Sequence, residues 1–180
     1  MSASTILIRT FPTPFGELLL GAFNDELCLC DWRFRKMRRA VDMRLQQGLQ
    51  ADYSEGDPPV INEAIAQLSD YFLRKRTGFD LPLRLVGTAF QQRVWQALRN
   101  VPYGTTESYA ALTAKVAAPT AIRAVASANG ANALSILVPC HRIIGSNGEL
   151  TGYAGGLDAK RRLLELEGAG KLQLDLFERI

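Results

Sequence analysis

The stretch SILVPCHR, residues 135–142, carries the features on which the interpretation of the whole chain depends. An apolar run of strand length ends at Pro139, which cannot donate to a sheet ladder, and Cys140 follows at the exit of the expected strand. His141, the only histidine in the protein, comes next. Because a cysteine reacts as its thiolate and an imidazole is a base at neutral pH, this pair predicts a nucleophile with its base.

Successive side chains of a strand point to opposite faces, so we expect a water molecule to bridge Cys140 and His141. We also expect a third residue that orients the imidazole. Glu167 is the candidate, because it falls on the apolar face of a helix predicted over residues 158–167, with Asp158 as its N-cap. A negative charge in the last turn opposes the helix dipole, and a bond to His141 would offset this cost. The alternative is a structural cysteine beside a buried histidine.

The composition is that of a soluble globular protein, because 180 residues of which 47% are hydrophobic can bury a sizeable core. No apolar run approaches the roughly 18 residues of a membrane span, and the N-terminus has no signal segment. Three cysteines leave an odd thiol under any pairing, which favours a reducing cytoplasm. Cys28 and Cys30 have no histidine near them in the sequence, so no metal site is expected there.

The predicted fold is α/β, in the α+β arrangement, with two domains and a tail. Residues 1–86 contain predicted strands at 6–10, 17–23 and 27–32, a helix after Trp32 and another over 60–74. Basic residues crowd the start of the first helix, where a solvated helix face is favoured over a phosphate-binding patch. Residues 87–170 are expected to be mostly helical, beginning with Thr88 as an N-cap. The whole net charge of +3 lies in this second part, which permits contact with a polyanion.

Residues 106–129 predict a helix-turn-helix, because two segments with apolar residues at helical spacing flank a short connection at 117–119. In the second helix Arg123 is the one long polar side chain, and the other outward positions are mostly small: Ala121, Ala124, Ser127 and Ala128. Such a surface lacks the side chains that read base edges in the major groove. It favours close approach of the backbone to DNA, with one arginine in a vacated place of the base stack. Plain core packing is the alternative for the helical spacing itself.

These motifs together resemble the O6-alkylguanine-DNA alkyltransferases, also called methylated-DNA–protein-cysteine methyltransferases. The resemblance rests on PCHR at 139–142, GYAGG at 152–156, Glu167-Gly168 and Arg123-Ala124-Val125, in the order and spacing of that family. It covers residues 88–168, whereas residues 1–86 are similar to the family's ribonuclease H-like N-terminal domain in pattern only.

The resemblance implies direct reversal of DNA damage without a cofactor. The protein would flip O6-alkylguanine, and also O4-alkylthymine, out of duplex DNA and transfer the alkyl group irreversibly to Cys140, once per molecule. The implied catalytic residues are Cys140, His141, Glu167 and Asn132, the last bracing the segment before the cysteine. The implied DNA-binding residues are Arg123, Tyr109, Thr105, Ala124, Ser127 and Asn129. The implied base pocket consists of Tyr153, Ala154, Gly155 and Ile143.

Within this set, Arg123 would replace the flipped nucleotide, and Tyr109 would crowd the 3′ phosphate and help to rotate the base out. Ala154 stands where some relatives carry a serine, so recognition of the guanine oxygen would fall to backbone amides. The zinc site of some eukaryotic relatives has no ligand set here.

The tail, residues 171–180, contains a second resemblance. Its sequence QLDLF resembles the peptide by which bacterial polymerases and repair proteins dock on the sliding clamp, with the residues Gln173, Leu174, Asp175, Leu176 and Phe177. The alternative is a short strand that pairs with the N-terminal sheet. The expected partners are double-stranded DNA containing O6-alkylguanine and the bacterial sliding clamp, without a membrane. We expect a cytoplasmic monomer, and cooperative binding to DNA is left open.

Two other function classes compete with this interpretation. A cysteine hydrolase would also use a Cys-His pair, but it predicts repeated turnover, whereas a transferase predicts one burst equal to the protein present. A helix-turn-helix regulator would require base-reading side chains that the second helix lacks, and it gives Cys140 no role.

Overall fold

The computed structural model describes residues 4–169, and a four-stranded sheet organises its N-terminal half. The strands are β1 (Ser4–Thr13), β2 (Gly16–Phe23), β3 (Glu26–Trp32) and β4 (Ala51–Glu55), in the order β3-β2-β1-β4. Two antiparallel hairpins join β1 to β2 and β2 to β3, and β4 lies parallel to β1. The three predicted strands are confirmed. β4 was not predicted, because only Ala51 of its five residues is buried and its sequence is largely polar.

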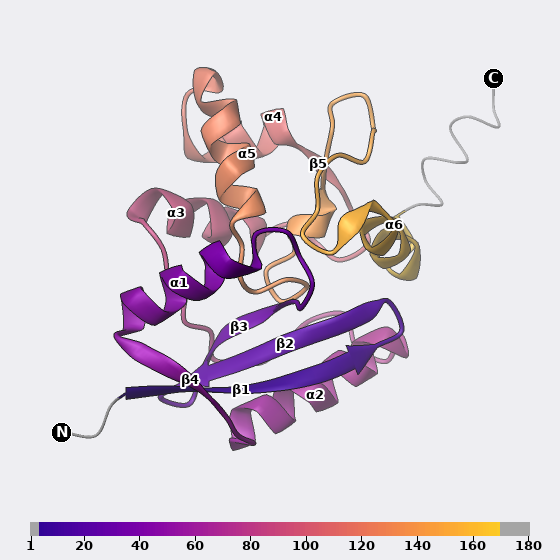
Figure 1. Cartoon of the computed structure of the whole chain (residues 1–180). Helices are drawn as coiled ribbons and strands as arrows, with labels where there is room; N and C mark the ends of the chain where they lie inside the picture. Colours follow the sequence, from indigo (N-terminus) through magenta and orange to yellow (C-terminus); the bar gives the residue numbers. More distant parts are fainter. Residues whose placement is uncertain (1–3, 170–180) are drawn as a thin grey trace.

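Two helices cover the two faces of this sheet (Figure 1). α1 (Arg38–Leu49) packs Val41 and Leu45 in a cluster with Ile6 and Leu29. α2 (Pro59–Phe72) belongs to the larger core cluster, which also contains Leu18, Leu20 and Leu27. The sheet therefore separates two apolar layers, and the larger one continues into the second half of the chain.

The second half is mostly helical, as expected. Its helices are α3 (Ala89–Leu98), α4 (Tyr109–Val116), α5 (Ile122–Gly130) and α6 (Gly156–Leu166), with short 3₁₀ turns η1 (Pro119–Ala121) and η2 (Cys140–Arg142). Thr88 caps α3 as predicted, in a reciprocal pair with Gln91. Two short strands, β5 (Glu107–Ser108) and β6 (Ile143–Ile144), pair in parallel and connect the start of α4 to the segment after Cys140.

Three details differ from the sequence predictions. The apolar run at 135–138 is a series of turns, in which the amides of Leu137 and Val138 bond to carbonyls two and four residues earlier. These local bonds leave no strand edge to pair, and only Leu134 bridges to Cys30. Helix α6 begins at Gly156, so Asp158 lies in its first turn and is not its N-cap. Ala128 of α5 is buried and does not face outward.

The two predicted domains share one hydrophobic cluster. Leu20 and Tyr71 of the first half belong to the same cluster as Leu98, Val125 and Cys140 of the second. The boundary between residues 86 and 87 stays a prediction. Among residues 4–169, no helix combines the length and apolar character that crossing a membrane requires.

Candidate active site

Cys140 stands at the first position of η2, where the chain leaves the turns that follow α5. Its side chain is almost fully buried, and Nδ2 of Asn132 lies 3.2 Å from Sγ. The same amide donates to the carbonyl of Val138 at 2.8 Å, and Oδ1 of Asn132 accepts the amide of Leu134 at 3.0 Å. Asn132 thus ties both ends of the turn segment together and contacts the sulfur.

Burial raises the pKa of the Cys140 thiol, while the bond from Asn132 and the positive charge of Lys160 act in the opposite direction. The thiol is therefore protonated at neutral pH and needs a base before it can react. The two other cysteines are worse nucleophiles by position, because both are buried in the strand β3, and burial raises the pKa of Cys28 to about 12.

His141 supplies a base beside this thiol. Its ring is fully buried, and Nε2 lies 2.8 Å from Oε1 of Glu167, so this nitrogen carries the proton in the neutral ring. Nδ1 is buried and makes no hydrogen bond to any residue between 4 and 169. Burial lowers the pKa of His141, although Glu167 opposes that shift. At neutral pH the imidazole is consequently unprotonated at Nδ1 and can accept a proton there.

The carboxylate of Glu167 collects more partners than the sequence predicted. Arg142 donates from Nε to Oε2 and from Nη2 to Oε1, both at 2.9 Å, and the hydroxyl of Tyr71 donates to Oε1 at 2.7 Å. Burial favours the neutral acid, but the hydrogen bonds and charges of His141 and Arg142 lower the pKa of Glu167 to about 2. Glu167 is therefore ionised. The sequence analysis did not identify Arg142 as a partner of Glu167, and its position next to His141 was the only feature that could have indicated this.

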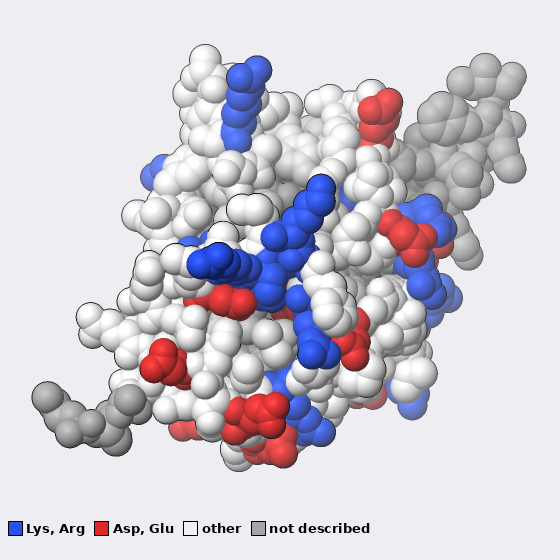
Figure 2. Space-filling model, in the orientation of Figure 1, with Lys and Arg blue, Asp and Glu red and all other residues white. Residues whose placement is uncertain are grey.

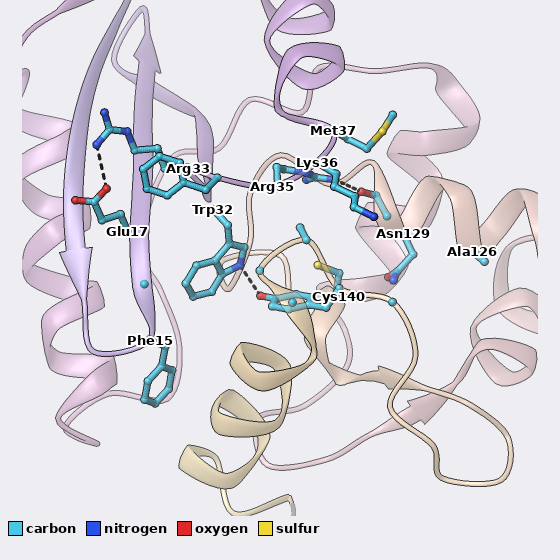
Figure 3. Close-up of a pocket in the computed structure, with 18 of the residues that line it drawn as sticks. Phe15, Glu17, Trp32, Arg33, Arg35, Lys36, Met37, Ala126, Asn129 and Cys140 are labelled. Carbon is cyan, nitrogen blue, oxygen red and sulfur yellow. Dashed lines mark hydrogen bonds and ion pairs between the residues drawn. The ribbon is translucent and has the colours of Figure 1, made fainter.

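A cavity of about 660 Å³ opens in front of Cys140 (Figure 3). Three of the four residues predicted for the base pocket, Tyr153, Ala154 and Gly155, line it. Ile143 does not: its side chain is fully buried in β6, and its carbonyl accepts a bond from Nζ of Lys160. The place of Ile143 in the base pocket therefore stays a prediction, and its side chain belongs to the core beside the strand pairing of β6.

Trp32, a residue of β3, fixes the loop that carries Tyr153. Its Nε1 donates to the hydroxyl of Tyr153 at 3.0 Å (Figure 3), and its ring lies against Gly155 so closely that a Cβ there would be 2.6 Å away. Nothing in the sequence around Trp32 indicated this contact. Lys160 holds the other side of the loop, since Nζ donates to the carbonyl of Thr151 at 2.9 Å. Burial lowers the pKa of Lys160 to about 8.

The predicted DNA-binding residues fall into two groups. Arg123, Ala124, Ser127 and Thr105 are exposed, the first three on α5 and the last in the loop before β5. Tyr109 and Asn129 instead line the cavity, and Asn129 is almost fully buried. The hydroxyl of Tyr109 lies 3.3 Å from the carbonyl of Thr151. Three of the six residues therefore lie on the exposed face of α5, one lies in a loop, and two line the cavity.

Basic side chains gather over the loop before α1 and the start of that helix (Figure 2). Arg35 and Arg38 both bond to the buried carboxylate of Asp31, and Arg33 pairs with Glu17. Lys36 is exposed and lines the cavity near Asn129 of α5 (Figure 3). Bonds to carboxylates thus partly neutralise the patch. Its exposed members, such as Lys36, fit the solvated helix face favoured from sequence, whereas the buried Arg35 does not.

Two predictions concern other kinds of site. The proposed clamp-binding residues, 173–177, lie outside the described residues. Between residues 4 and 169, no three potential metal ligands come together.

Known proteins resemble this chain in sequence and in structure. A family model described as "6-O-methylguanine DNA methyltransferase, DNA binding domain" matches residues 89–169. The methylated-DNA–protein-cysteine methyltransferase of Mycobacterium leprae (strain TN) is 55% identical over 162 residues, which cover 88% of this chain and 90% of that protein. The constitutive enzyme of that name from Bacillus subtilis (strain 168) is 43% identical over 159 residues, covering 88% and 93%.

A solved structure is similar over nearly the whole chain. The crystal structure of Mycobacterium tuberculosis OGT in complex with DNA superposes with a TM-score of 0.76 and 41% identity, covering 90% of this chain and 92% of that one. The mixed α/β architecture is confirmed by this similarity.

Proposed function

The chain belongs to the family of methylated-DNA–protein-cysteine methyltransferases, which repair DNA by alkyl transfer, and we propose that Cys140 is the residue that receives the alkyl group. One observation carries this proposal. The sulfur of Cys140 faces the cavity, with the amide of Asn132 on one side and the bonded pair of His141 and Glu167 next in the chain.

The chemistry follows from the protonation states of these groups. Nδ1 of His141 accepts the thiol proton of Cys140 through a bridging water, and Glu167 stabilises the imidazolium that forms. The thiolate attacks the alkyl carbon of O6-alkylguanine, so that an S–C bond forms while the C–O6 bond breaks and its electron pair stays on guanine. The imidazolium then returns the proton to the departing base. A thioether is not hydrolysed, so each molecule reacts once.

Access to the alkyl carbon requires that the base leave the duplex. The alkyl group weakens pairing, which lowers an extrusion cost of about a few kcal/mol. The exposed Ala124 and Ser127 of α5 are small enough for the helix to enter the minor groove, and Arg123 projects from the same exposed face to take the vacated place. Tyr109 and Asn129 then receive the extruded nucleotide at the cavity wall.

The base would lie between Tyr109 and the loop of Tyr153, with backbone amides near Ala154 and Gly155 recognising its oxygen. A pocket that reads a flat ring and one oxygen also admits O4-alkylthymine as a second substrate. In this proposal α4 and α5 form a helix-turn-helix, residues 1–86 a ribonuclease H-like domain, and the protein acts as a monomer in the cytoplasm, where its three free cysteines stay reduced.

Intact-mass spectrometry tests the transfer. The protein is mixed with duplex DNA that contains O6-methylguanine, and we expect a gain of one CH₂ unit that peptide mapping places on Cys140. Cys140→Ala should show no gain. A label on Cys28 or Cys30, or repeated release of product beyond one equivalent, would overturn the assignment.

The tail adds a partner to this proposal. Leu176 and Phe177 would fill an apolar pocket of the bacterial sliding clamp while Gln173 fixes the register. Tethering to the clamp raises the local concentration of DNA. Calorimetry of the full-length protein against the clamp should show binding that disappears when residues 173–177 are deleted, with transfer to short duplexes unchanged. Binding that survives the deletion would contradict this role.

A further inference from the structure

Oxygen Oε1 of Glu167 accepts hydrogen bonds from three different side chains. Nε2 of His141 lies at 2.8 Å, Nη2 of Arg142 at 2.9 Å and the hydroxyl of Tyr71 at 2.7 Å. His141 and Arg142 belong to η2, whereas Tyr71 belongs to α2 in the N-terminal half. Between residues 4 and 169, Tyr71 is the only residue of that half that hydrogen-bonds to this carboxylate.

Tyr71 lies in the core with its hydroxyl bonded to Glu167. The side chain is fully buried, and its ring contacts Phe72, Phe79 and Tyr103 with centroid distances between 5.4 and 6.2 Å. Burial first, and then the negative charge of Glu167, raise the pKa of Tyr71 far above its usual range. The hydroxyl therefore keeps its proton at neutral pH and donates it to the carboxylate of Glu167.

Donors that share one carboxylate oxygen compete for its negative charge. A bond from a neutral hydroxyl to a carboxylate is charge-assisted and withdraws electron density from the acceptor. The more strongly Tyr71 bonds to Oε1, the less strongly this oxygen attracts the proton on Nε2 of His141. The basicity of Nδ1, on the other side of the ring, depends in turn on that attraction.

We propose that Tyr71 is a positioning residue of the alkyl transfer, whose hydroxyl fixes the carboxylate of Glu167 and limits how strongly that carboxylate polarises His141. The proposal rests on the proton relay described above. It assigns the N-terminal half a direct influence on the base, through one hydrogen bond across the interface between the halves.

The other charged or titratable groups near His141 are its neighbours in η2 and residues of the following segments. They are Cys140, Arg142, Tyr153, Lys160 and Glu167. Of these, Arg142 and Lys160 lower the pKa of His141 and Glu167 raises it. A change confined to the Tyr71 hydroxyl leaves all of these side chains in place, so its effect on His141 is separable from theirs.

The test uses the fact that His141 is the only histidine of the chain. Its imidazole signals in ¹H–¹⁵N NMR need no assignment, and their pH titration reports its pKa directly. In Tyr71→Phe, Oε1 keeps more negative charge, so the imidazolium is favoured and the pKa of His141 should rise by about 0.5 to 1 unit. The acid limb of the rate of reaction with the free base O6-benzylguanine should move upward by the same amount, with little change on the alkaline side.

Two comparisons separate this role from a structural one. Tyr53→Phe removes another tyrosine hydroxyl of the N-terminal half, which is partly buried and donates to Asp42 at 2.8 Å, and it should leave the titration unchanged. Site-specific 3-fluorotyrosine at position 71, a more acidic donor, should shift the pKa of His141 downward. An unmoved titration in both Tyr71 variants, or an equal shift in Tyr53→Phe, would overturn the proposal. The titration requires no alkyl transfer, so its outcome does not depend on the proposed function. The role of His141 as the base of the transfer is tested separately, and it fails if His141→Ala reacts at the unaltered rate.

Discussion

The thiol of Cys140 is subject to opposing influences that single residues control. Burial raises its pKa, whereas the amide of Asn132 at 3.2 Å and the charge of Lys160 lower it. Asn132 also holds the carbonyl of Val138 and the amide of Leu134. One side chain thus positions the sulfur and also lowers its pKa against the effect of burial.

Replacing this amide should affect reactivity and stability together. In Asn132→Ala we expect the pKa of Cys140 to rise further, so alkylation by iodoacetamide slows at neutral pH and reaches its plateau at higher pH. Loss of three buried hydrogen bonds should lower the free energy of unfolding by about 2 to 3 kcal/mol. Urea melts and the pH dependence of alkylation measure the two effects.

Asn100→Ala is the matched control, because the amide of Asn100 makes one exposed bond to a backbone carbonyl at 3.4 Å. It should change neither measurement. If Asn132→Ala destabilises the protein but leaves the alkylation profile in place, Asn132 acts only on the backbone.

The sequence predicted the relay residues unequally. Cys140 and His141 are adjacent, and Glu167 was recognisable because a charge on an apolar helix face needs a partner. Tyr71 carried no such feature: a tyrosine on the buried face of an amphipathic helix is ordinary core, and its partner lies 96 residues away. The side chain of Ile143 is buried in the core, because neighbours of a reactive residue need not share its direction.

At the scale of elements, the loop of Tyr153 depends on a close contact with β3. Gly155 leaves no room for a Cβ, which would lie 2.6 Å from the ring of Trp32. The bond from Trp32 to the Tyr153 hydroxyl crosses the same contact. The loop and the strand therefore hold each other in place at the cavity wall.

Gly155→Ala should force the Tyr153 loop away from Trp32 of β3. We expect slower reaction with O6-benzylguanine, because Tyr153 moves with the loop, and a loss of about 1 to 3 kcal/mol in the free energy of unfolding. Gly78→Ala is the control, since Gly78 has open space around it and an ordinary φ. Equal rates in the two variants would show that the loop adapts without displacing Tyr153.

We predict that helix α5 contributes to the reaction with duplex DNA but not to the reaction with the free base. Arg123→Ala should slow repair of O6-methylguanine in duplex DNA by about tenfold or more, since filling the vacated stack offsets an extrusion cost of a few kcal/mol. Reaction with the free base should be unaffected, because no base is extruded. Single-turnover kinetics on both substrates measure this difference. The control is Arg9→Ala in β1, which removes an arginine from another part of the chain and should leave both rates unchanged. An equal loss of rate on both substrates in Arg123→Ala would contradict the proposed role of Arg123 in base extrusion.

Helices and strands could be predicted where the spacing of their apolar residues was regular. The strands β1 to β3 and the helices α2 to α5 follow the apolar spacing of their sequences. The run at 135–138 has the composition of a strand, yet side-chain bonds from Asn132 and Ser135 hold it in turns. A short apolar run such as 136–138 does not by itself distinguish these outcomes.

At the scale of the whole molecule, the two halves meet along β3 and the segment 130–135. Arg35 donates to the carbonyls of Gly130 and Asn132, and the hydroxyl of Ser135 donates to Asp31 at 3.0 Å. The position of Asn132, and through it that of Cys140, thus depends on the N-terminal half. Local sequence patterns do not predict such pairings, because their partners are about a hundred residues apart.

The titratable groups of the relay also link the stability of the whole protein to pH. The folded state lowers the pKa of Glu167 from 4.5 to about 2, so the unfolded chain binds the proton more readily. The stabilisation is therefore complete above pH 4.5 and is lost as the pH falls toward 2. His141 also makes the protein less stable as the pH falls, but at higher pH. Its pKa in the folded protein lies below the value of 6.5 in the unfolded chain, so the unfolded chain binds the proton first and folding becomes less favourable below about pH 6.5.

The free energy of unfolding should consequently fall from about pH 6.5 downward, in two overlapping stages, and Glu167→Gln should remove the second. At neutral pH this variant leaves the buried Arg142 without its carboxylate, which should cost about 3 kcal/mol. Because protonated Glu167 and glutamine are both neutral, the difference from the original protein should shrink as the pH approaches 2. Urea melts at constant ionic strength across this range measure it. A difference that stays constant with pH would mean that Glu167 does not titrate between these limits, and that its contribution comes from packing and not from its charge.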